Sequence, residues 1–269
     1  MTGSSSRVKS AERVLAVLDL LARHAGPVTT AAVSSELELP KSTTHHLLNV
    51  MLRQRYVAYW PDIRMWTLGV AAFEIGAAYH RSGHLQHAAQ RYLSDLTART
   101  GHTSHLAVLQ GNDVIYLDKR EPRGSGIRLV TDVGTRLPAH LTAVGRSLLS
   151  TLGTDALVSM YTGYDWPQRT DVRVASLGDL LPALDDVRRQ GYALELGATT
   201  DGIECIAAPV LVADGSAVAA VGIAMVAGTG VDASALTASV LDAARSFSNS
   251  LTNENSGSGN TDAINETEI

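Results

Sequence analysis

The chain has 269 residues, of which 45% are apolar and 18% are charged, a composition typical of a globular protein. A chain of this length is most naturally divided into two domains, each able to bury its own core. No stretch approaches the roughly 18 uninterrupted apolar residues of a membrane span, and the polar N-terminus lacks an apolar secretion core. We therefore expect a cytoplasmic protein. The single cysteine, Cys205, excludes an intrachain disulfide and a cysteine-based zinc site.

The net charge of −5 is unevenly distributed along the chain. Residues 1–70 contain eight Lys or Arg and five Asp or Glu, a net of +3, whereas the remaining 199 residues contain fourteen and twenty-two, a net of −8. A mildly basic N-terminal region on an acidic body suits local contact with a polyanion. The excess is too small to establish such contact by itself.

The first 70 residues show the pattern of three helices followed by a β-hairpin. Gly26-Pro27 ends the first helical pattern, Thr29 or Thr30 can cap the second, and Pro40 fits the first turn of the third. The expected elements are helices at 9–24, about 30–38 and 40–55, and strands at 56–59 and 65–68. This is the element order of a winged helix-turn-helix, which places its recognition helix in a DNA major groove.

The outward face of the third helix is polar and basic. Hydroxyl, imidazole and amide groups on this face can reach base edges, and its cations are suited to phosphates. An arginine at the hairpin turn can contact the DNA backbone or the minor groove. The expected DNA-binding residues are Lys41, Ser42, Thr43, His45, His46, Asn49, Arg53 and Arg64.

Beyond the hairpin, a helical pattern at 71–78 and a polar stretch at 79–87 lead to a further helix at 85–99. From Gly101 the pattern is that of a mixed α/β domain. Strands are expected at 104–109, 113–118, 127–130, 192–195, 206–211 and 218–225, and helices at 142–152, 155–162, 177–190 and 233–251. Residues 252–269 are poor in apolar side chains, so we expect a disordered tail.

Both halves together resemble the IclR (isocitrate lyase regulator) family of bacterial transcription factors. The most specific motif is Gly-Ile-Glu-Cys-Ile-Ala-Ala-Pro-Val at 202–210. The other matching segments are Leu-Pro-Lys-Ser-Thr at 39–43, Leu47-Leu48, Tyr56-Val57, Leu68-Gly69, Thr-Gly-His-Thr at 100–103, Val-Ile-Tyr-Leu-Asp at 114–118, Gly-Thr-Arg-Leu-Pro-Ala-His at 134–140, Thr-Ala-Val-Gly-Arg at 142–146, and Gly191-Tyr192. The resemblance covers about residues 9–250.

The resemblance implies an α/β (α+β) protein: a winged helix-turn-helix followed by a GAF-like mixed α/β effector-binding domain. We expect a disordered N-terminus at 1–8, the DNA-binding domain at 9–70, a helical linker used in dimerisation at 71–99, the effector domain at 100–251 and the tail at 252–269. The protein is then a homodimer, or a dimer of dimers, that binds operator DNA and regulates a catabolic operon, as a repressor more often than as an activator. No cofactor or catalysis is expected. Family members often carry Arg at the position of His46, so the resemblance does not predict the operator sequence.

An effector site is expected where Thr142 caps a helix, because backbone N–H groups at a helix start can bind a carboxylate. The resemblance adds an acidic residue, the cysteine and two small strand residues. The expected effector-binding residues are Ala143, Val144, Glu195, Cys205, Gly222 and Ala224. The last two positions can be Ser in the family, and their lost hydroxyls favour an organic acid that is bulkier or more apolar than glyoxylate or pyruvate. Leu106 and Met225 are weaker candidates for the lining, since each more often belongs to plain core.

Three alternatives stay open at this point. Cys205 with His102, His105 and His140 allows a nucleophile hypothesis, although a thiol among apolar neighbours is usually inert. The spacing of His80, His84 and His87 allows a metal site on one helix face, but Gly83 interrupts the helix and a solvated linker is favoured. A small-molecule sensor that acts on a protein partner is the alternative to DNA binding.

Overall fold

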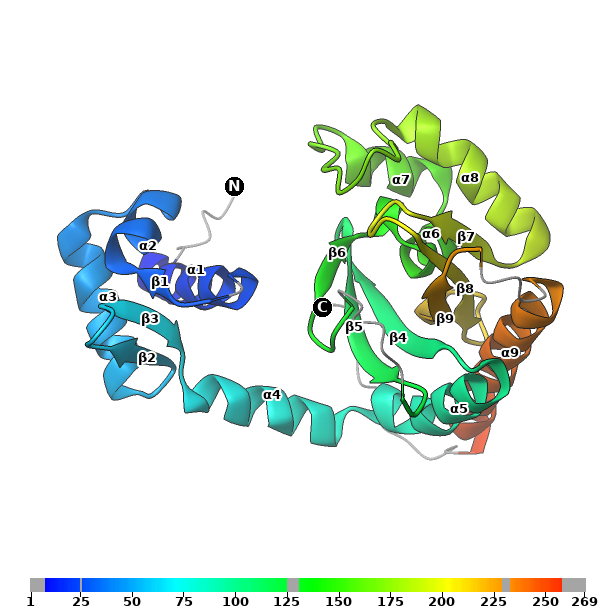
Figure 1. The fold of residues 1–269 in the computed structure, drawn as a ribbon, viewed down its shortest axis with the longest axis horizontal. Coiled ribbons are helices and arrows are strands. Elements are labelled where there is room, and N and C mark those ends of the chain that lie inside the picture. The colour runs from blue at the N-terminus through cyan, green and yellow to red at the C-terminus, as the bar shows by residue number, and fades with distance from the viewer. Residues whose placement is uncertain (1–7, 25, 125–130, 229–232, 258–269) are drawn as a thin grey trace, which may run out of the picture. The chain divides into compact units, whose positions relative to one another are not determined.

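The computed structural model describes residues 8–24, 26–124, 131–228 and 233–257 (Figure 1). The chain divides into two compact units between Gly83 and His84. Each unit has its own hydrophobic core. None of the helices in the described part combines the length and the apolar character that a membrane span requires.

The N-terminal unit contains helices packed against a small antiparallel sheet with the strand order β1-β3-β2. Its elements are α1 (Lys9–Arg23), β1 (Val28–Thr29), α2 (Thr30–Glu36), α3 (Lys41–Arg53), β2 (Val57–Trp60), β3 (Met65–Leu68) and α4 (Val70–Ser82). Val17, Leu20, Val33, Leu48 and Trp66 are buried between them. The three helices and the hairpin of a winged helix-turn-helix are therefore present.

The sequence pattern misplaces the ends of these elements by a few residues. Pro40 is the N-cap of α3 rather than a residue of its first turn. The helix ends at Arg53, two residues early, because Arg55 adopts a φ of 62° that no α-helix contains. The two-residue strand β1 was not expected, since so short a strand carries no periodicity of its own.

The segment expected to be a polar linker at 79–87 is helical on both sides of Gly83. Helix α4 runs to Ser82, and α5 (His84–Thr100) begins immediately after Gly83. The region expected as a helical linker at 71–99 is therefore helical apart from Gly83. His80 lies on α4, whereas His84 and His87 lie on α5. Within the described residues, no group of three or more His, Cys, Asp or Glu side chains could hold a metal ion.

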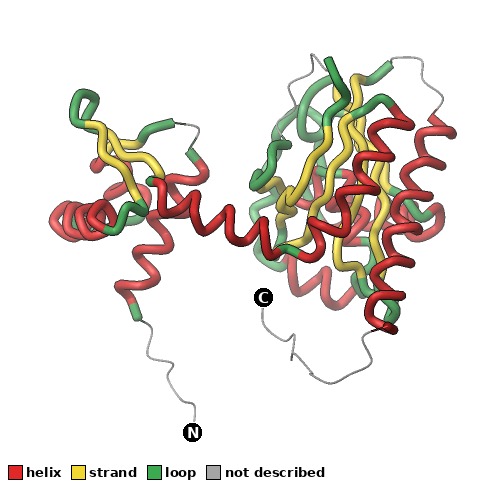
Figure 2. Tube along the Cα trace, turned by 90° about the horizontal axis from the view of Figure 1, so that it is seen from below, coloured by secondary structure: helices red, strands yellow, loops and turns green. Residues whose placement is uncertain are grey.

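The C-terminal unit is built on a six-stranded antiparallel sheet with the order β6-β5-β4-β9-β8-β7. Its remaining elements are β4 (Thr103–Gln110), β5 (Asp113–Arg120), β6 (Arg136–Pro138), the 3₁₀ turn η1 (Ala139–Leu141), α6 (Ala143–Leu149), α7 (Thr154–Tyr161), α8 (Leu177–Gln190), β7 (Ala193–Leu196), β8 (Ile203–Leu211), β9 (Ala217–Val226) and α9 (Ala233–Gly257). Helices α5 and α9 cover one face, and α6 packs on the other, with α7 and α8 beyond it (Figures 1 and 2).

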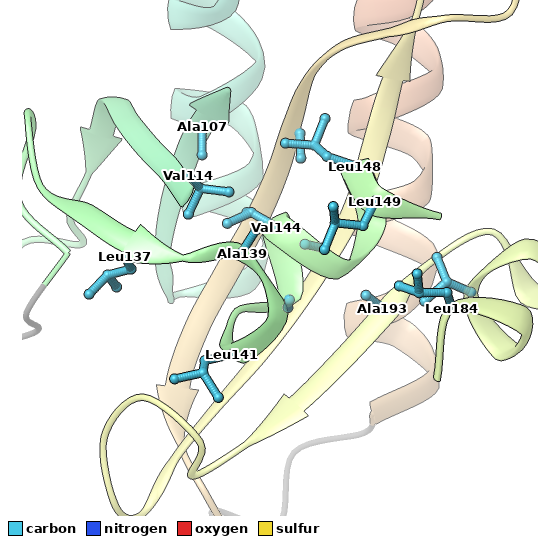
Figure 3. Packing of buried hydrophobic residues seen from close by; sticks show 14 of the residues in the cluster. Ala107, Val114, Leu137, Ala139, Leu141, Val144, Leu148, Leu149, Leu184 and Ala193 are labelled. Atoms are coloured by element: carbon cyan, nitrogen blue, oxygen red, sulfur yellow. The ribbon is translucent and has the colours of Figure 1, made fainter. Parts of the chain in front are cut away.

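Alternate residues of each central strand enter different cores, as the two-residue period of a strand requires. Ile206 of β8 and Val221 of β9 join the core under α5 and α9. Ala207 and Ala220, their neighbours in sequence, join the core under α6 (Figure 3). The α6 core is tight at one point, since a Cβ on Gly145 would lie 2.1 Å from the carbonyl oxygen of Ala139. Only glycine allows α6 to lie this close to η1.

Several expected boundaries in this unit differ from the structure. The expected strand at 127–130 lies outside the described residues, and the short strand β6 was missed. Helix α6 ends at Leu149 rather than at residue 152, and α9 continues to Gly257, so the first residues of the expected disordered tail are helical. Composition alone did not reveal this extension, because Asn, Ser and Glu can continue a helix that packing has already formed.

Candidate functional sites: a recognition helix and an enclosed polar cavity

The recognition helix α3 has one buried side and one exposed side. Thr44, Leu47, Leu48 and Met51 are buried, and the hydroxyl of Thr44 donates to the carbonyl of Pro40. The exposed members of the expected DNA-binding set are Lys41, Ser42, His45, His46 and Arg53, and Thr43 and Asn49 are half-buried. The helix contains no Asp or Glu. Its outward surface can therefore approach phosphates without an opposing carboxylate on the same helix.

The amide nitrogen of Asn49 is already engaged in hydrogen bonding within α3. This nitrogen donates to the backbone carbonyl of His45 at 2.8 Å and lies 2.7 Å from Nδ1 of the same residue. Asn49 therefore orients the His45 ring. The side-chain carbonyl oxygen of Asn49 takes no part in these contacts and can accept a bond from DNA.

The hairpin β2–β3 presents an exposed turn. Arg64 lies in this turn with a φ of 54° and is exposed. Trp60 and Ile63, at 55% and 52% exposure, are also open to solvent at the hairpin. The indole nitrogen of Trp60 donates to the hydroxyl of Thr67, which ties the end of one strand to its partner. The turn thus combines one cation with flat apolar surface.

A second site lies in the C-terminal unit, between the first turn of α6 and the face of β8 and β9 that α6 covers. All six expected effector-binding residues line this one cavity: Ala143, Val144, Glu195, Cys205, Gly222 and Ala224. The register explains the arrangement, since Glu195 pairs with Cys205 and Cys205 pairs with Ala224 across neighbouring strands. The cap at its edge is formed as expected, because the Thr142 hydroxyl accepts from the backbone N–H of Gly145 at 2.9 Å.

The cavity is small, and Gly222 does not enlarge it. A Cβ at Gly222 would lie 2.6 Å from the carbonyl oxygen of Ile206 and 2.8 Å from the Cβ of Ala207, so strand β8 already fills that space. The reasoning that a missing Ser side chain leaves extra volume is therefore wrong at this position. The cavity measures about 20 Å³, which is enough for roughly one water molecule. Any larger ligand must move the walls apart.

Among the lining residues that the structure describes, Glu195 is the only one with a carboxylate, and it is 2% exposed. It accepts bonds from the backbone N–H of Ala198 and, at 3.5 Å, from the hydroxyl of Thr199. Burial raises the pKa of Glu195, against the opposing effects of these bonds and of the Arg146 guanidinium. Among the described residues, the lining contains no Lys or Arg.

The thiol of Cys205 donates a hydrogen bond to the carboxylate of Glu195, not to a histidine. Burial, together with the neighbouring Glu195, raises the thiol pKa well above its usual range. His105 shares the cavity, but its Nε2 lies 2.7 Å from the Thr131 hydroxyl. His140 packs instead against Tyr161, Tyr164 and Trp166, away from the lining residues. The Cys–His nucleophile hypothesis is therefore not supported, because Cys205 has a carboxylate rather than an imidazole as its partner and its pKa is raised rather than lowered.

Leu106 and Met225 were considered for the lining and do not belong to it. Both are buried in the core under α5 and α9, on the opposite face of the sheet. They neighbour His105 and Ala224 in sequence, which face the cavity. Strand alternation places each pair of neighbours on opposite faces.

The sequence reasoning missed a second group of lining residues. They are His105, Tyr116, Thr131, Thr199, Thr200 and Ile203, together with Ile206, Ala207 and Ile223. The signal for His105 was an imidazole next to the apolar run Leu-Ala-Val-Leu at 106–109 of the same strand. It could not be assigned to the cavity, because the sequence does not show that β4 lies next to β9.

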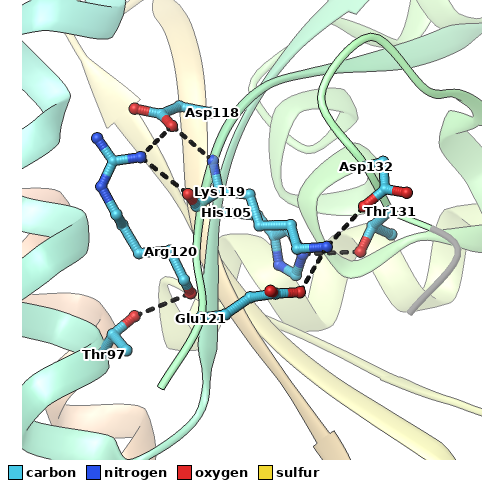
Figure 4. A network of polar contacts seen from close by, with 8 residues as sticks. All are labelled: Thr97, His105, Asp118, Lys119, Arg120, Glu121, Thr131 and Asp132. Carbon is cyan, nitrogen blue, oxygen red and sulfur yellow. Dashed lines mark hydrogen bonds and ion pairs between the residues drawn. The ribbon is translucent and has the colours of Figure 1, made fainter. Parts of the chain in front are cut away.

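The Thr131 side of the cavity is attached to β5 by ion pairs (Figure 4). The Lys119 ammonium contacts the carboxylates of Glu121 and Asp132, each at 2.7 Å. On the other side of the strand, Arg120 contacts Asp118 at 2.5 Å. Lys119 is held by these two carboxylates and is not among the lining residues. The side chains that line this side of the cavity include His105 and Thr131.

Comparison with known proteins assigns the chain to a family. Residues 10–61 match the IclR helix-turn-helix domain, and residues 77–249 match the bacterial transcriptional regulator IclR C-terminal domain. Since these matches cover most of the chain, it belongs to the IclR family and is a DNA-binding transcriptional regulator.

Individual relatives agree with this assignment. The chain is 34% identical to the transcriptional regulator XynR of Escherichia coli K12 over 76% of this chain and 80% of XynR. It is 30% identical to the E. coli K12 transcriptional repressor AllR over 79% of this chain and 78% of AllR. The fold is that of an IclR homologue from Microbacterium hydrocarbonoxydans, crystallised with 4-hydroxybenzoate, with a TM-score of 0.74, 22% identity, and coverage of 90% of this chain and 98% of that one.

Proposed function

We propose that this regulator represses a catabolic operon by binding operator DNA as a homodimer, and that an organic acid bound in the α6 cavity changes its affinity for DNA. The observation that carries the effector part is that all six expected residues, from α6, β7, β8 and β9, line one enclosed cavity. In this proposal residues 9–70 bind DNA, residues 71–99 connect and dimerise, and residues 100–251 bind the effector. The protein acts in the cytoplasm, where operator DNA lies.

The DNA contact is assigned to α3 and the hairpin turn. His45, His46, Ser42 and Thr43 are placed to read bases, whereas Lys41, Arg53 and Arg64 are placed to bind phosphates. Asn49 contributes by orienting the His45 ring. That the protein represses transcription, rather than activating it, is proposed from its relative AllR, which is named a repressor.

Homodimer formation is supported by exposed apolar side chains on α4. Phe73 is 73% exposed, and Val70, Ile75 and Tyr79 are each more than half exposed. Side chains of this kind are usually covered by a partner. A dimer of dimers is the alternative assembly, and light scattering of the purified protein distinguishes the two by mass.

The DNA contact is tested by fluorescence anisotropy with the DNA upstream of the protein's own gene. His45→Ala is expected to weaken specific binding by about 1–3 kcal/mol, roughly 5- to 150-fold. Arg53→Ala is expected to weaken binding to all sequences and to reduce the salt-dependence slope by about 1. Arg189→Ala, an exposed arginine on α8, is the control and should change neither quantity.

Specific binding that survives both α3 substitutions would contradict the assignment to α3. Absence of any specific binding to this DNA, together with retention of a protein partner, would favour the alternative of a sensor that acts on a protein.

The effector is proposed to be an acid with one negative charge that is bulkier or more apolar than glyoxylate or pyruvate. One negative charge suits a cavity that already contains Glu195 and whose described lining residues include no Lys or Arg. Apolar side chains of Ala143, Val144, Ile203 and Ala224 suit a ring or chain. Because the cavity is small, binding must select a wider state, and this differential affinity can couple the cavity to DNA binding.

Isothermal titration calorimetry tests the effector class with glyoxylate, pyruvate, benzoate and cyclohexanecarboxylate. Binding of the two larger acids, with weaker or no binding of the two keto acids, is expected. Tight binding of glyoxylate or pyruvate without binding of the larger acids would refute the proposed size.

A further inference from the structure

The cavity has two polar sides on different strands. Glu195 lies on β7, whereas His105 lies on β4 and Tyr116 on β5. Strands β9 and β8 separate β4 from β7, so the backbones of these two strands are about 14 Å apart. Between them, Gly222 and Ala224 present almost no side chain. A ligand seated over these small residues has a polar group of the protein at each end.

His105 and Tyr116 form a unit on their side. Their ring centroids are 5.3 Å apart with an interplanar angle of 72°. The Nε2 atom of His105 is engaged by the Thr131 hydroxyl, which holds the ring in one orientation. Among the described residues, no group bonds to the Nδ1 atom of His105 or to the phenolic oxygen of Tyr116. Two oriented hydrogen-bonding groups therefore remain available on the cavity wall.

We propose that His105 and Tyr116 select the effector by binding an uncharged polar substituent, a hydroxyl group, on the side of the cavity formed by β4 and β5. This inference rests on the proposed effector function of the cavity and adds the chemical class: a hydroxylated monocarboxylic acid rather than an unsubstituted one. Neither residue belongs to the set that the family resemblance implies.

A hydroxyl fits this wall better than a second carboxylate does. Burial, aided by the Lys119 ammonium, lowers the pKa of His105 to about 3, so the imidazole is neutral. Burial also raises the pKa of Tyr116 well above its usual range, so the phenol keeps its proton. A neutral donor and acceptor pair can satisfy a hydroxyl group, whereas a buried carboxylate needs a compensating charge.

Calorimetry on the full chain tests the proposal with two pairs of acids that differ in one hydroxyl group: benzoate and 4-hydroxybenzoate, and cyclohexanecarboxylate and its 4-hydroxy derivative. The wild type should prefer the hydroxylated member of at least one pair by about tenfold or more, since an unfilled polar wall penalises the other member. Tyr116→Phe and His105→Leu should each abolish most of that preference, measured as the ratio of the affinities for the two members of one pair.

Tyr161→Phe is the matched control. Tyr161 is also buried, and its hydroxyl has no partner among the described residues, but it lies outside the cavity lining. This variant should keep the wild-type preference. His105→Gln, which retains a donor and an acceptor, serves if His105→Leu lowers the melting temperature strongly, and it should keep part of the preference.

The outcomes separate the two levels of the argument. If the acids bind the wild type but Tyr116→Phe and His105→Leu keep the hydroxyl preference, the assignment of the wall is wrong and the effector function stands. If none of the four acids binds a wild-type protein that still binds its DNA, the proposed effector class is wrong and the wall assignment is rejected with it.

Discussion

Restoring a serine at Gly222 and at Ala224 should have opposite consequences, although both positions line the same cavity. A Cβ at Gly222 would meet the Ile206 carbonyl oxygen at 2.6 Å and the Ala207 Cβ at 2.8 Å. Both atoms belong to the neighbouring strand β8, so neither can move aside as the flexible end of a long side chain could. Gly222→Ser must therefore separate β8 from β9 or distort the pair. Ala224→Ser adds one oxygen to a Cβ that the structure already accommodates.

The magnitude follows from the cost of overpacking a sheet centre, which is about 1–3 kcal/mol. For a domain of roughly 150–250 residues, each kcal/mol shifts the melting temperature by about 2–4 °C. Gly222→Ser should therefore lower the melting temperature by about 2–12 °C. Ala224→Ser should stay within about 1 kcal/mol of the wild type and should strengthen binding of pyruvate, because the new hydroxyl faces the cavity.

Differential scanning calorimetry of both variants, with Gly222→Ala as a third, checks this reasoning. Gly222→Ala should be destabilised nearly as much as Gly222→Ser, because the clash arises at the Cβ. Equal melting temperatures for Gly222→Ser and Ala224→Ser would show that β8 can move away from β9 at little cost in stability. In that case the absence of a side chain at Gly222 would serve ligand volume after all.

Three further predictions concern the same domain. Thr142→Ala removes the cap of α6 and should cost about 1 kcal/mol in chemical unfolding, while Thr142→Ser should restore most of it; no difference between the two would rule out the capping bond. Because burial lowers the pKa of His105 to about 3, the unfolded chain binds a proton near pH 6.5 that the folded chain binds only near pH 3, so stability falls as the pH decreases through this window. His105→Gln should flatten that loss in urea titrations at pH 7, 6, 5 and 4, and an unchanged pH profile would argue against a buried neutral imidazole. Finally, since burial and Glu195 raise the pKa of Cys205, native protein at pH 8 should react with iodoacetamide far more slowly than unfolded protein; equal rates by mass spectrometry would contradict the thiol assignment.

Local patterns were sufficient where packing reinforces them. The helical period in α1 and α3, the cap at Thr142 and the hairpin β2–β3 all appear where the sequence indicated. The errors lie where local pattern and packing diverge. The helix expected at 40–55 ends at Arg53, because Arg55 adopts a positive φ. The strand β6 has three residues, too few for any period to be seen.

The candidate site shows the same division. The expected helix start at Thr142 indicated Ala143 and Val144, the resemblance to the IclR family implied the other four residues, and all six line one cavity. His105, Tyr116 and Thr131 were not found this way, because they reach the cavity from strands on its other side. Gly222 was assigned correctly to the lining but for the wrong reason, since the closeness of β8 is a property of the folded sheet.

By itself, the sequence indicated the two-part organisation, the polar face of α3, and residues near α6 and Cys205 that line one cavity. These properties depend on side-chain chemistry and on contacts between residues close in the chain, which the order of residues contains. Only the tertiary structure decided which strands are neighbours, which side of each strand faces α6, and how little space lies between them. Those properties depend on pairing between distant segments, and a shift of one residue in register would have turned His105 and Glu195 away from the cavity.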